Sequence, residues 1–179
     1  MSEQMKDPVP DWSGLCTLAA DLGAALRARG WRLATAESCT GGLVSAAVTS
    51  VAGSSDWFDR GFVSYSNAAK TALLGVPVAL IDRVGAVSAE VAQAMAQGAA
   101  LRAGVDVAVA VTGIAGPGGG TAQKPVGTVW FGLAWQDGTA QRTQTRLVRF
   151  DGDRARVRFA AAALALRWVQ QVAGDAAAR

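Results

Sequence analysis

Few side chains in this sequence can transfer protons, because its 179 residues include no histidine. That absence excludes a Ser-His-Asp or Cys-His catalytic group and a histidine-ligated metal within the chain. Proton transfer would therefore fall to carboxylates, to one of three lysines, to the single tyrosine, Tyr65, or to a cysteine. Acidic residues do not cluster at metal-binding spacings, so we expect neither a metal ion nor another cofactor.

The first segment that could carry chemistry is TAESCTGG, residues 35–42, where a strand is expected to turn into a helix. Free N–H groups at the start of such a helix could hold a phosphate or the oxyanion of acyl transfer. Ser38 is the candidate nucleophile, and Cys39 is its rival because a helix N-terminus favours a thiolate. The alternative is that Ser38 or Thr40 only caps the helix.

The second segment, SYSNAAK, residues 64–70, places Tyr65 before an expected helix and Lys70 in the first turn of that helix. Lysine can lose its proton when it is buried, whereas arginine cannot. The helix dipole also disfavours an ammonium group at this position. Lys70 could therefore act as a base near neutral pH. The alternative is a solvated surface lysine beside a core tyrosine.

Two further segments could bind an anion. TGIAGPGGG, residues 112–120, matches neither a P-loop nor a dinucleotide fingerprint, but its glycines would let backbone amides approach a phosphate. GDRARVR, residues 152–158, places Arg154 at the opening of a helix, where its planar donors could bind a phosphate. The alternatives are a flexible surface loop and arginines that only solubilise the helix.

The candidate segments follow expected strands of an α/β pattern, where such folds bind ligands. Strands that alternate with helices and end in a hairpin predict a three-layer α/β/α sandwich around a mixed sheet. We expect one domain over residues 12–173, with a disordered leader at 1–11 and a ragged tail at 174–179. Helices are expected at 12–29, 40–50, 67–74, 88–103 and 153–172, and strands at 31–36, 60–66, 105–112, 128–135 and 139–149.

Composition indicates a globular chain, with 51% hydrophobic and 17% charged residues and a net charge of +3. The first twelve residues do not have the basic and apolar pattern of a signal peptide. The longest apolar run, residues 159–166, is too short to span a bilayer. We therefore expect a cytoplasmic protein that does not bind membranes. Nucleic acid is not an expected partner, because the arginines of 142–158 have no aromatic platform among them.

Together these motifs closely resemble the CinA C-terminal domain family. The matching runs, in order over about residues 15–172, are TAESCTGG, GSSDWFDRGFVSYSNAAK, GAVSAEVA, VTGIAGPGGG…KPVGTVWFGLA and GDR. Stand-alone members, of the PncC type, are nicotinamide mononucleotide amidohydrolases. The resemblance thus implies hydrolysis of that carboxamide to nicotinate mononucleotide and ammonia, in pyridine-nucleotide recycling. It also suggests a homodimer or a larger homo-oligomer.

The resemblance also implies roles for individual residues. The family motifs match a catalytic serine, tyrosine and lysine at Ser38, Tyr65 and Lys70. They match further site residues at Thr112 and Arg154. The full set of expected substrate-binding residues is Cys39, Thr40, Gly41, Gly42, Thr112, Gly113 and Arg154.

The mechanism expected from these roles is acyl transfer. Lys70 would take the proton of Ser38, directly or through Tyr65, and amides near residues 39–42 would stabilise the tetrahedral oxyanion. The alternative is a non-catalytic, regulatory nucleotide-binding module, in which Ser38 and Lys70 would be dispensable.

Overall fold

A computed structural model of the chain describes residues 3–4 and 9–175. Within them, six strands form one sheet in the order β1-β6-β5-β4-β2-β3. β5 is antiparallel to both of its neighbours, and all other neighbouring pairs are parallel. The strands are β1 (Glu3–Gln4), β2 (Leu33–Glu37), β3 (Phe58–Val63), β4 (Val107–Gly113), β5 (Thr128–Asp137) and β6 (Ala140–Arg149).

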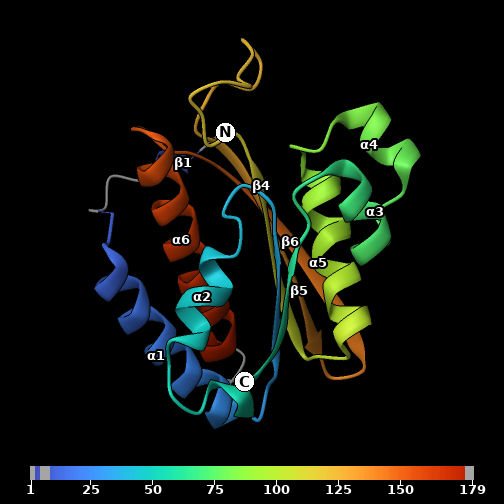
Figure 1. The fold of residues 1–179 in the computed structure, drawn as a ribbon. Coiled ribbons are helices and arrows are strands. Elements are labelled where there is room, and N and C mark those ends of the chain that lie inside the picture. The colour runs from blue at the N-terminus through green and yellow to red at the C-terminus, as the bar shows by residue number, and fades with distance from the viewer. Residues whose placement is uncertain (1–2, 5–8, 176–179) are drawn as a thin grey trace.

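Helices cover both faces of this mixed sheet (Figure 1). One face carries α1, α2 and α6, and the other carries α3, α4 and α5. This arrangement confirms the expected three-layer α/β/α sandwich. The helices are α1 (Trp12–Arg29), α2 (Leu43–Thr49), α3 (Asn67–Leu74), α4 (Val78–Val84), α5 (Ala89–Ala103) and α6 (Arg154–Asp175), with a short 3₁₀ turn, η1 (Ser54–Asp56).

The long helices form where the sequence supplies caps. Side chains that accept a hydrogen bond from an amide in the first turn begin α1, α3, α5 and α6. Glycines in the left-handed conformation follow the last residue of α1, α3 and α5. The four capping residues are Asp11, Ser66, Ser88 and Asp153.

Several boundaries differ from those expected. The second helix begins at Leu43 rather than at residue 40, because Gly41 and Gly42 have φ angles of +61° and +93° that continue the turn. β1, η1 and α4 were not predicted. Residues 3–4 of the expected disordered leader form β1, and residues 174–175 of the expected tail extend α6. The rest of the leader before Val9, and residues 176–179, lie outside the described residues.

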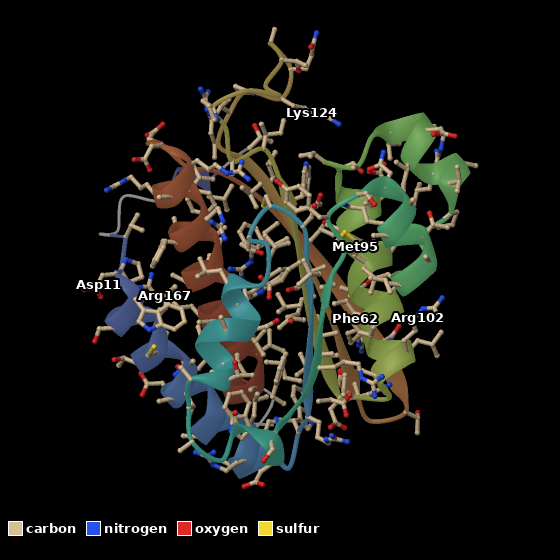
Figure 2. All side chains as sticks on the ribbon, viewed as in Figure 1. Asp11, Phe62, Met95, Arg102, Lys124 and Arg167 are labelled. Atoms are coloured by element: carbon tan, nitrogen blue, oxygen red, sulfur yellow. The ribbon has the colours of Figure 1, made fainter. Side chains whose placement is uncertain are left out.

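Because helices cover both faces, the two central parallel strands are buried almost completely. The core beneath α1, α2 and α6 includes the large side chains of Trp57, Phe131 and Trp168. The core on the other side contains Val91 and Met95 of α5, which carries Met95 toward the sheet (Figure 2). The buried sheet therefore fixes the positions at which the loops leave the strands.

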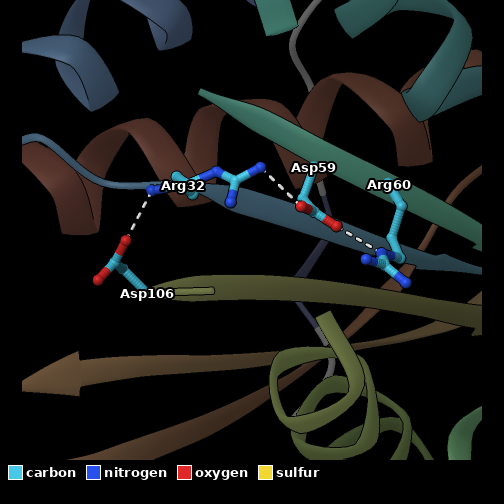
Figure 3. Close-up of polar contacts among 4 residues, drawn as sticks. All are labelled: Arg32, Asp59, Arg60 and Asp106. Carbon is cyan, nitrogen blue, oxygen red and sulfur yellow. Dashed lines mark hydrogen bonds and ion pairs between the residues drawn. The ribbon is translucent and has the colours of Figure 1, made fainter. Parts of the chain in front are cut away.

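Polar contacts join three parallel strands at their amino ends (Figure 3). The amide of Arg32, just before β2, donates to the Asp106 carboxylate, just before β4, over 2.8 Å. The guanidinium of Arg32 pairs with the carboxylate of Asp59 in β3 at 2.6 Å, and the Arg60 side chain donates to the same carboxylate. Hydrogen bonding from Arg60 lowers the pKa of Asp59. These contacts hold the amino ends of β3, β2 and β4 together, at the edge of the sheet away from their carboxyl ends.

The carboxyl ends of the same strands form a crevice. β2 lies between β3 and β4, and the chain passes from β2 through α2 to β3 on one side before it later reaches β4 on the other. Loops that leave such neighbouring strands diverge, and ligands bind α/β sheets at this switch in strand order. The expected site segments 35–42, 64–70 and 112–120 all reach this edge.

Candidate active site

Ser38 directly follows β2, and its amide donates to the Val111 carbonyl of β4 over 2.9 Å. The residue is 8% exposed. Gly42 occupies the cap position of α2 without a side-chain hydrogen bond, so neither Ser38 nor Thr40 caps that helix. The alternative interpretation of Ser38 as a simple helix cap is therefore wrong.

Lys70 points from α3 to Ser38. Its Nζ lies 3.0 Å from Ser38 Oγ, 2.9 Å from the Ser64 carbonyl oxygen and 3.4 Å from the Tyr65 carbonyl oxygen. The side chain is 1% exposed, so Lys70 is not a solvated surface lysine. Burial lowers the pKa of Lys70 from its usual 10.5. Among the described residues, no carboxylate forms an ion pair with Lys70.

The three oxygens around the Lys70 nitrogen can each accept a hydrogen bond from an ammonium, and they also suit a neutral amine. A neutral amine has two N–H donors and one lone pair, and the carbonyls of Ser64 and Tyr65 can accept the two donors. The lone pair is then left for the hydroxyl hydrogen of Ser38 at the observed 3.0 Å. This separation lies within the range over which a general base takes a proton.

Cys39 lacks the features of a nucleophile. Its side chain is buried, and burial raises the pKa of the thiol to about 12, to which the charge of Glu37 adds. The thiol is therefore uncharged at neutral pH, whereas a cysteine nucleophile reacts as the thiolate. The expectation that a helix N-terminus would favour a Cys39 thiolate is wrong for this site.

Tyr65 presents two different groups to the site. Its backbone carbonyl faces Lys70, while its hydroxyl accepts a hydrogen bond from Arg154 Nη2 over 2.9 Å. The other terminal nitrogen of Arg154 donates to the Gly116 carbonyl over 2.8 Å. Tyr65 is 59% exposed, and within the described part of the chain its hydroxyl contacts neither Lys70 nor Ser38. A proton relay through this hydroxyl has no contact to support it here.

A pocket of about 220 Å³ opens at this edge of the sheet. Thr112 at the end of β4 forms part of its wall, and its hydroxyl donates to the Ala86 carbonyl over 2.9 Å. That hydroxyl is thus already engaged in holding the wall together. The expected site residues that line the pocket are Ser38, Cys39, Tyr65, Lys70, Thr112, Gly113 and Arg154.

The structure does not bring Thr40, Gly41 or Gly42 to this pocket. The Gly41 amide donates to the Ser38 carbonyl, and the Gly42 amide donates to the Glu37 carboxylate. The Thr40 side chain is fully buried.

Two amides of the turn remain available. Those of Cys39 and Thr40 donate no hydrogen bond to any described residue. Of the expected oxyanion donors at 39–42, these two are therefore the free ones.

Sequence reasoning missed four pocket residues. Asn67 is the first residue of α3, Ala86 and Val87 lie between α4 and α5, and Ala115 follows β4. The small apolar side chains have no chemistry that a motif search would detect. Asn67 has a side-chain amide and lies within the SYSNAAK motif, which is a signal that could have singled it out.

The long loop after β4 is fastened to the opposite side of the pocket. The Nζ of Lys124 donates to the Val84 carbonyl at the end of α4 over 3.0 Å. Figure 2 shows Lys124 reaching from this loop toward the α4 side. The contact joins the loop to the segment that carries Ala86 and Val87.

A buried serine–lysine pair beside the free amide of Cys39, at the switch point of an α/β/α sandwich, defines a candidate acyl-transfer enzyme. The model of the CinA C-terminal domain family matches residues 15–173. The chain belongs to this family.

Relatives over most of the chain have names that describe hydrolases, and this chain is an enzyme of that class. "Nicotinamide-nucleotide amidohydrolase PncC" of Enterobacter agglomerans is 57% identical over 84% of this chain and 90% of its own. The protein of the same name from Escherichia coli strain K12 is 50% identical over 89% and 94%. A "CinA-like protein" of Geotalea daltonii is 53% identical over 79% of this chain but 33% of its own length.

Solved structures share the fold. The competence/damage inducible protein CihA of Agrobacterium tumefaciens matches with a TM-score of 0.83 at 41% identity, over 90% of this chain and 96% of its own. A CinA superfamily protein of Klebsiella pneumoniae matches with a TM-score of 0.84 at 37% identity, over 90% and 98%.

None of the helices within residues 3–4 and 9–175 is long and apolar enough to cross a bilayer. No group of three cysteine or acidic side chains in the same residues lies close enough together to hold a metal ion.

Proposed function

We propose that this chain hydrolyses the carboxamide of nicotinamide mononucleotide to nicotinate mononucleotide and ammonia. The names of its PncC relatives support this substrate. The observation that carries the chemistry is the 3.0 Å contact between Lys70 Nζ and Ser38 Oγ within a buried site.

In the first half of the reaction, neutral Lys70 accepts the proton of Ser38 as Oγ attacks the carboxamide carbon. The new C–O bond forms while the carbonyl electron pair moves onto oxygen. The amide of Cys39 is the donor proposed for this oxyanion, because Cys39 lines the pocket and its amide has no other partner among the described residues. One such donor typically lowers the barrier by about 3 kcal/mol.

The tetrahedral intermediate then collapses. The Lys70 ammonium gives its proton to the carboxamide nitrogen, the C–N bond breaks and ammonia leaves. An ester between Ser38 and the nicotinoyl carbon remains. Lys70, neutral again, takes a proton from water as the water attacks this ester, and it returns that proton to Ser38 Oγ when nicotinate mononucleotide departs.

Direct transfer between Lys70 and Ser38 is favoured over a relay through Tyr65. The Tyr65 hydroxyl bonds to Arg154 instead, at the mouth of the pocket. We propose that the pyridine ring enters the pocket beside Thr112 and Gly113. The phosphate would stay at the mouth near the Arg154 guanidinium, whose planar donors suit it.

Ammonia release from nicotinamide mononucleotide tests the proposal, with wild type measured beside Ser38→Ala, Lys70→Arg and Cys39→Ala. We expect activity in wild type and Cys39→Ala, and loss of at least about a thousandfold in the other two. Lys70→Arg is the sharper variant because arginine keeps the charge and cannot act as a base. A wild type that binds the nucleotide but releases no ammonia would reject the amidase and favour the regulatory binding module.

We further propose that the protein acts in the cytoplasm as a homodimer or larger homo-oligomer. Both statements rest on the sequence-based expectations above. Sedimentation velocity on the purified chain tests the second, and a monomer at micromolar concentration would reject it.

A further inference from the structure

A buried carboxylate that takes no part in the proposed proton transfers lies directly before the nucleophile. Glu37, the last residue of β2, is 1% exposed. An ionised group is costly to bury unless hydrogen bonds replace its water, so its partners show what it does.

The Glu37 carboxylate accepts four hydrogen bonds from the start of α2. Its Oε2 accepts from the amides of Gly42 and Val44, each over 3.0 Å. Its Oε1 accepts from the amide and the hydroxyl of Ser45, over 2.8 Å and 2.7 Å. These amides are the ones that the first turn of a helix leaves without partners. Glu37 therefore caps α2 from the strand that precedes it.

This cap closes the turn that contains the nucleophile. The backbone from Ser38 to Gly42 is held at one end by β2 and at the other by the bonds from Glu37 to α2. In the middle of the turn, Arg158 of α6 donates to the Thr40 carbonyl from Nη2 over 2.8 Å. Contacts on two sides thus restrict the turn that directs Ser38 Oγ to Lys70.

The cap also determines which amides of this region remain without a hydrogen-bond partner. Because Glu37 accepts the Gly42, Val44 and Ser45 amides, the start of α2 has no free donor at these positions for a substrate oxygen. The amides of Cys39 and Thr40 lie before this capped region and keep their donors free.

We propose that Glu37 is a positioning residue for the Ser38 reaction. Its carboxylate binds the α2 amides so that Ser38 Oγ stays aligned with Lys70 and those amides do not compete with the Cys39 amide for the oxyanion. This inference rests on the proposed function. It assigns Glu37 no contact with substrate and no transfer of a proton.

The test compares Glu37→Gln with Val107→Ala. Glutamine keeps the size of Glu37 but replaces one acceptor oxygen with an NH₂ group that faces amide donors. Val107 is buried at the amino end of β4, about 16 Å along the strand from Thr112, so its truncation weakens the fold without touching the turn. Both are measured for Tm and for kcat and KM of ammonia release, well below either Tm.

We expect Glu37→Gln to lower kcat by about 10- to 100-fold while KM changes less than about threefold, because misalignment affects the reacting atoms more than binding. The acid limb of its pH profile should stay where it is in wild type, since Glu37 transfers no proton. Val107→Ala should keep the wild-type kcat. Equal kcat losses in the two variants, or a vanished acid limb in Glu37→Gln, would overturn the proposal.

A second readout separates this proposal from the amidase itself. A fluorophosphonate labels an activated serine regardless of the natural substrate. If wild type releases no ammonia but is labelled at Ser38, slower labelling of Glu37→Gln than of Val107→Ala supports the positioning role while rejecting the amidase. Equal labelling of the two variants, or an unlabelled and inactive wild type, overturns the positioning role.

Discussion

Arg154 Nη2 donates to the Tyr65 hydroxyl over 2.9 Å and so joins the first residue of α6 to the loop after β3. Its Nη1 donates to the Gly116 carbonyl in the loop after β4. The guanidinium therefore connects three segments at the mouth of the pocket. An incoming phosphate would meet a cation that is already held in position.

Tyr65→Phe is expected to raise the KM for nicotinamide mononucleotide about three- to tenfold and to leave kcat within about threefold of wild type. The reason is that phenylalanine keeps the backbone carbonyl that faces Lys70 and removes only the acceptor for Arg154. Arg154→Ala should raise KM more, about 10- to 100-fold, as expected for loss of a charge-assisted hydrogen bond to a phosphate.

A double-mutant cycle checks that the two residues act together. If Tyr65 acts by holding Arg154, Tyr65→Phe should change KM little once Arg154 is alanine. A fall in kcat for Tyr65→Phe as large as that for Lys70→Arg would instead show that the hydroxyl relays the proton.

Cys39 is expected to resist alkylation. Burial raises the pKa of its thiol to about 12, so at pH 8 almost none is thiolate, and the side chain is also inaccessible. Mass spectrometry after iodoacetamide treatment of the native protein should find label at the half-buried Cys16 before it appears at Cys39. Fast labelling of Cys39 together with loss of activity would restore it as a rival nucleophile. Unfolding in denaturant should make both cysteines react, which is the control.

Features encoded locally were predictable from the sequence. Ser88 caps α5, and the β-branched apolar run that forms β4 is buried on both faces, as its pattern indicates. A helix cap and the period of a strand both depend on residues that are close together in the sequence. α4 directly follows Gly75 and Pro77, which predict the end of a helix, and its Ile81 is buried only by packing against the rest of the fold, so the local pattern does not reveal it.

The site was predictable as a set of residues but not as a set of contacts. Lysine and serine in separate motifs indicated an acid–base pair, whereas the burial of Lys70 depends on α3 packing over the strands. Arg154 meets Tyr65 across 89 positions of sequence, a contact that only the closed sandwich creates. The sequence alone does not show whether Gly41 and Gly42 belong to a helix or to a turn. Their positive φ angles continue the turn, so that α2 begins only at Leu43 and its first amides do not reach the pocket.

Gly98 of α5 is expected to tolerate no side chain. A Cβ at this position would overlap the Leu74 carbonyl oxygen at the end of α3. Gly98→Ala should therefore cost about 1–3 kcal/mol of unfolding free energy despite the better helix propensity of alanine. A Cβ added to Gly174 in α6 would meet no atom within 4 Å, so Gly174→Ala is the matched control and should be neutral or stabilise by up to about 1 kcal/mol. Urea unfolding measures both, and equal midpoints for the two variants would contradict the close approach of α3 and α5.

The pH dependence of activity should report Lys70. Below its pKa, Lys70 is an ammonium and cannot accept the Ser38 proton, so kcat/KM should rise with pH through that pKa. Burial lowers the pKa of Lys70 from 10.5, so kcat/KM should increase at a lower pH than it would with an ordinary lysine as the base. Profiles of kcat/KM from pH 6 to 10 measure this, and a flat profile would contradict Lys70 as the base.

The same shift has a consequence for stability that can be measured without substrate. Between the lowered folded pKa and 10.5, the unfolded chain binds more protons at Lys70 than the folded chain does, so stability rises with pH across that window. Lys70→Met cannot titrate and should show a smaller rise in Tm over the same range. If wild type and Lys70→Met follow the same pH dependence of Tm, Lys70 keeps an ordinary pKa in the folded protein, and the neutral base on which the mechanism depends is lost.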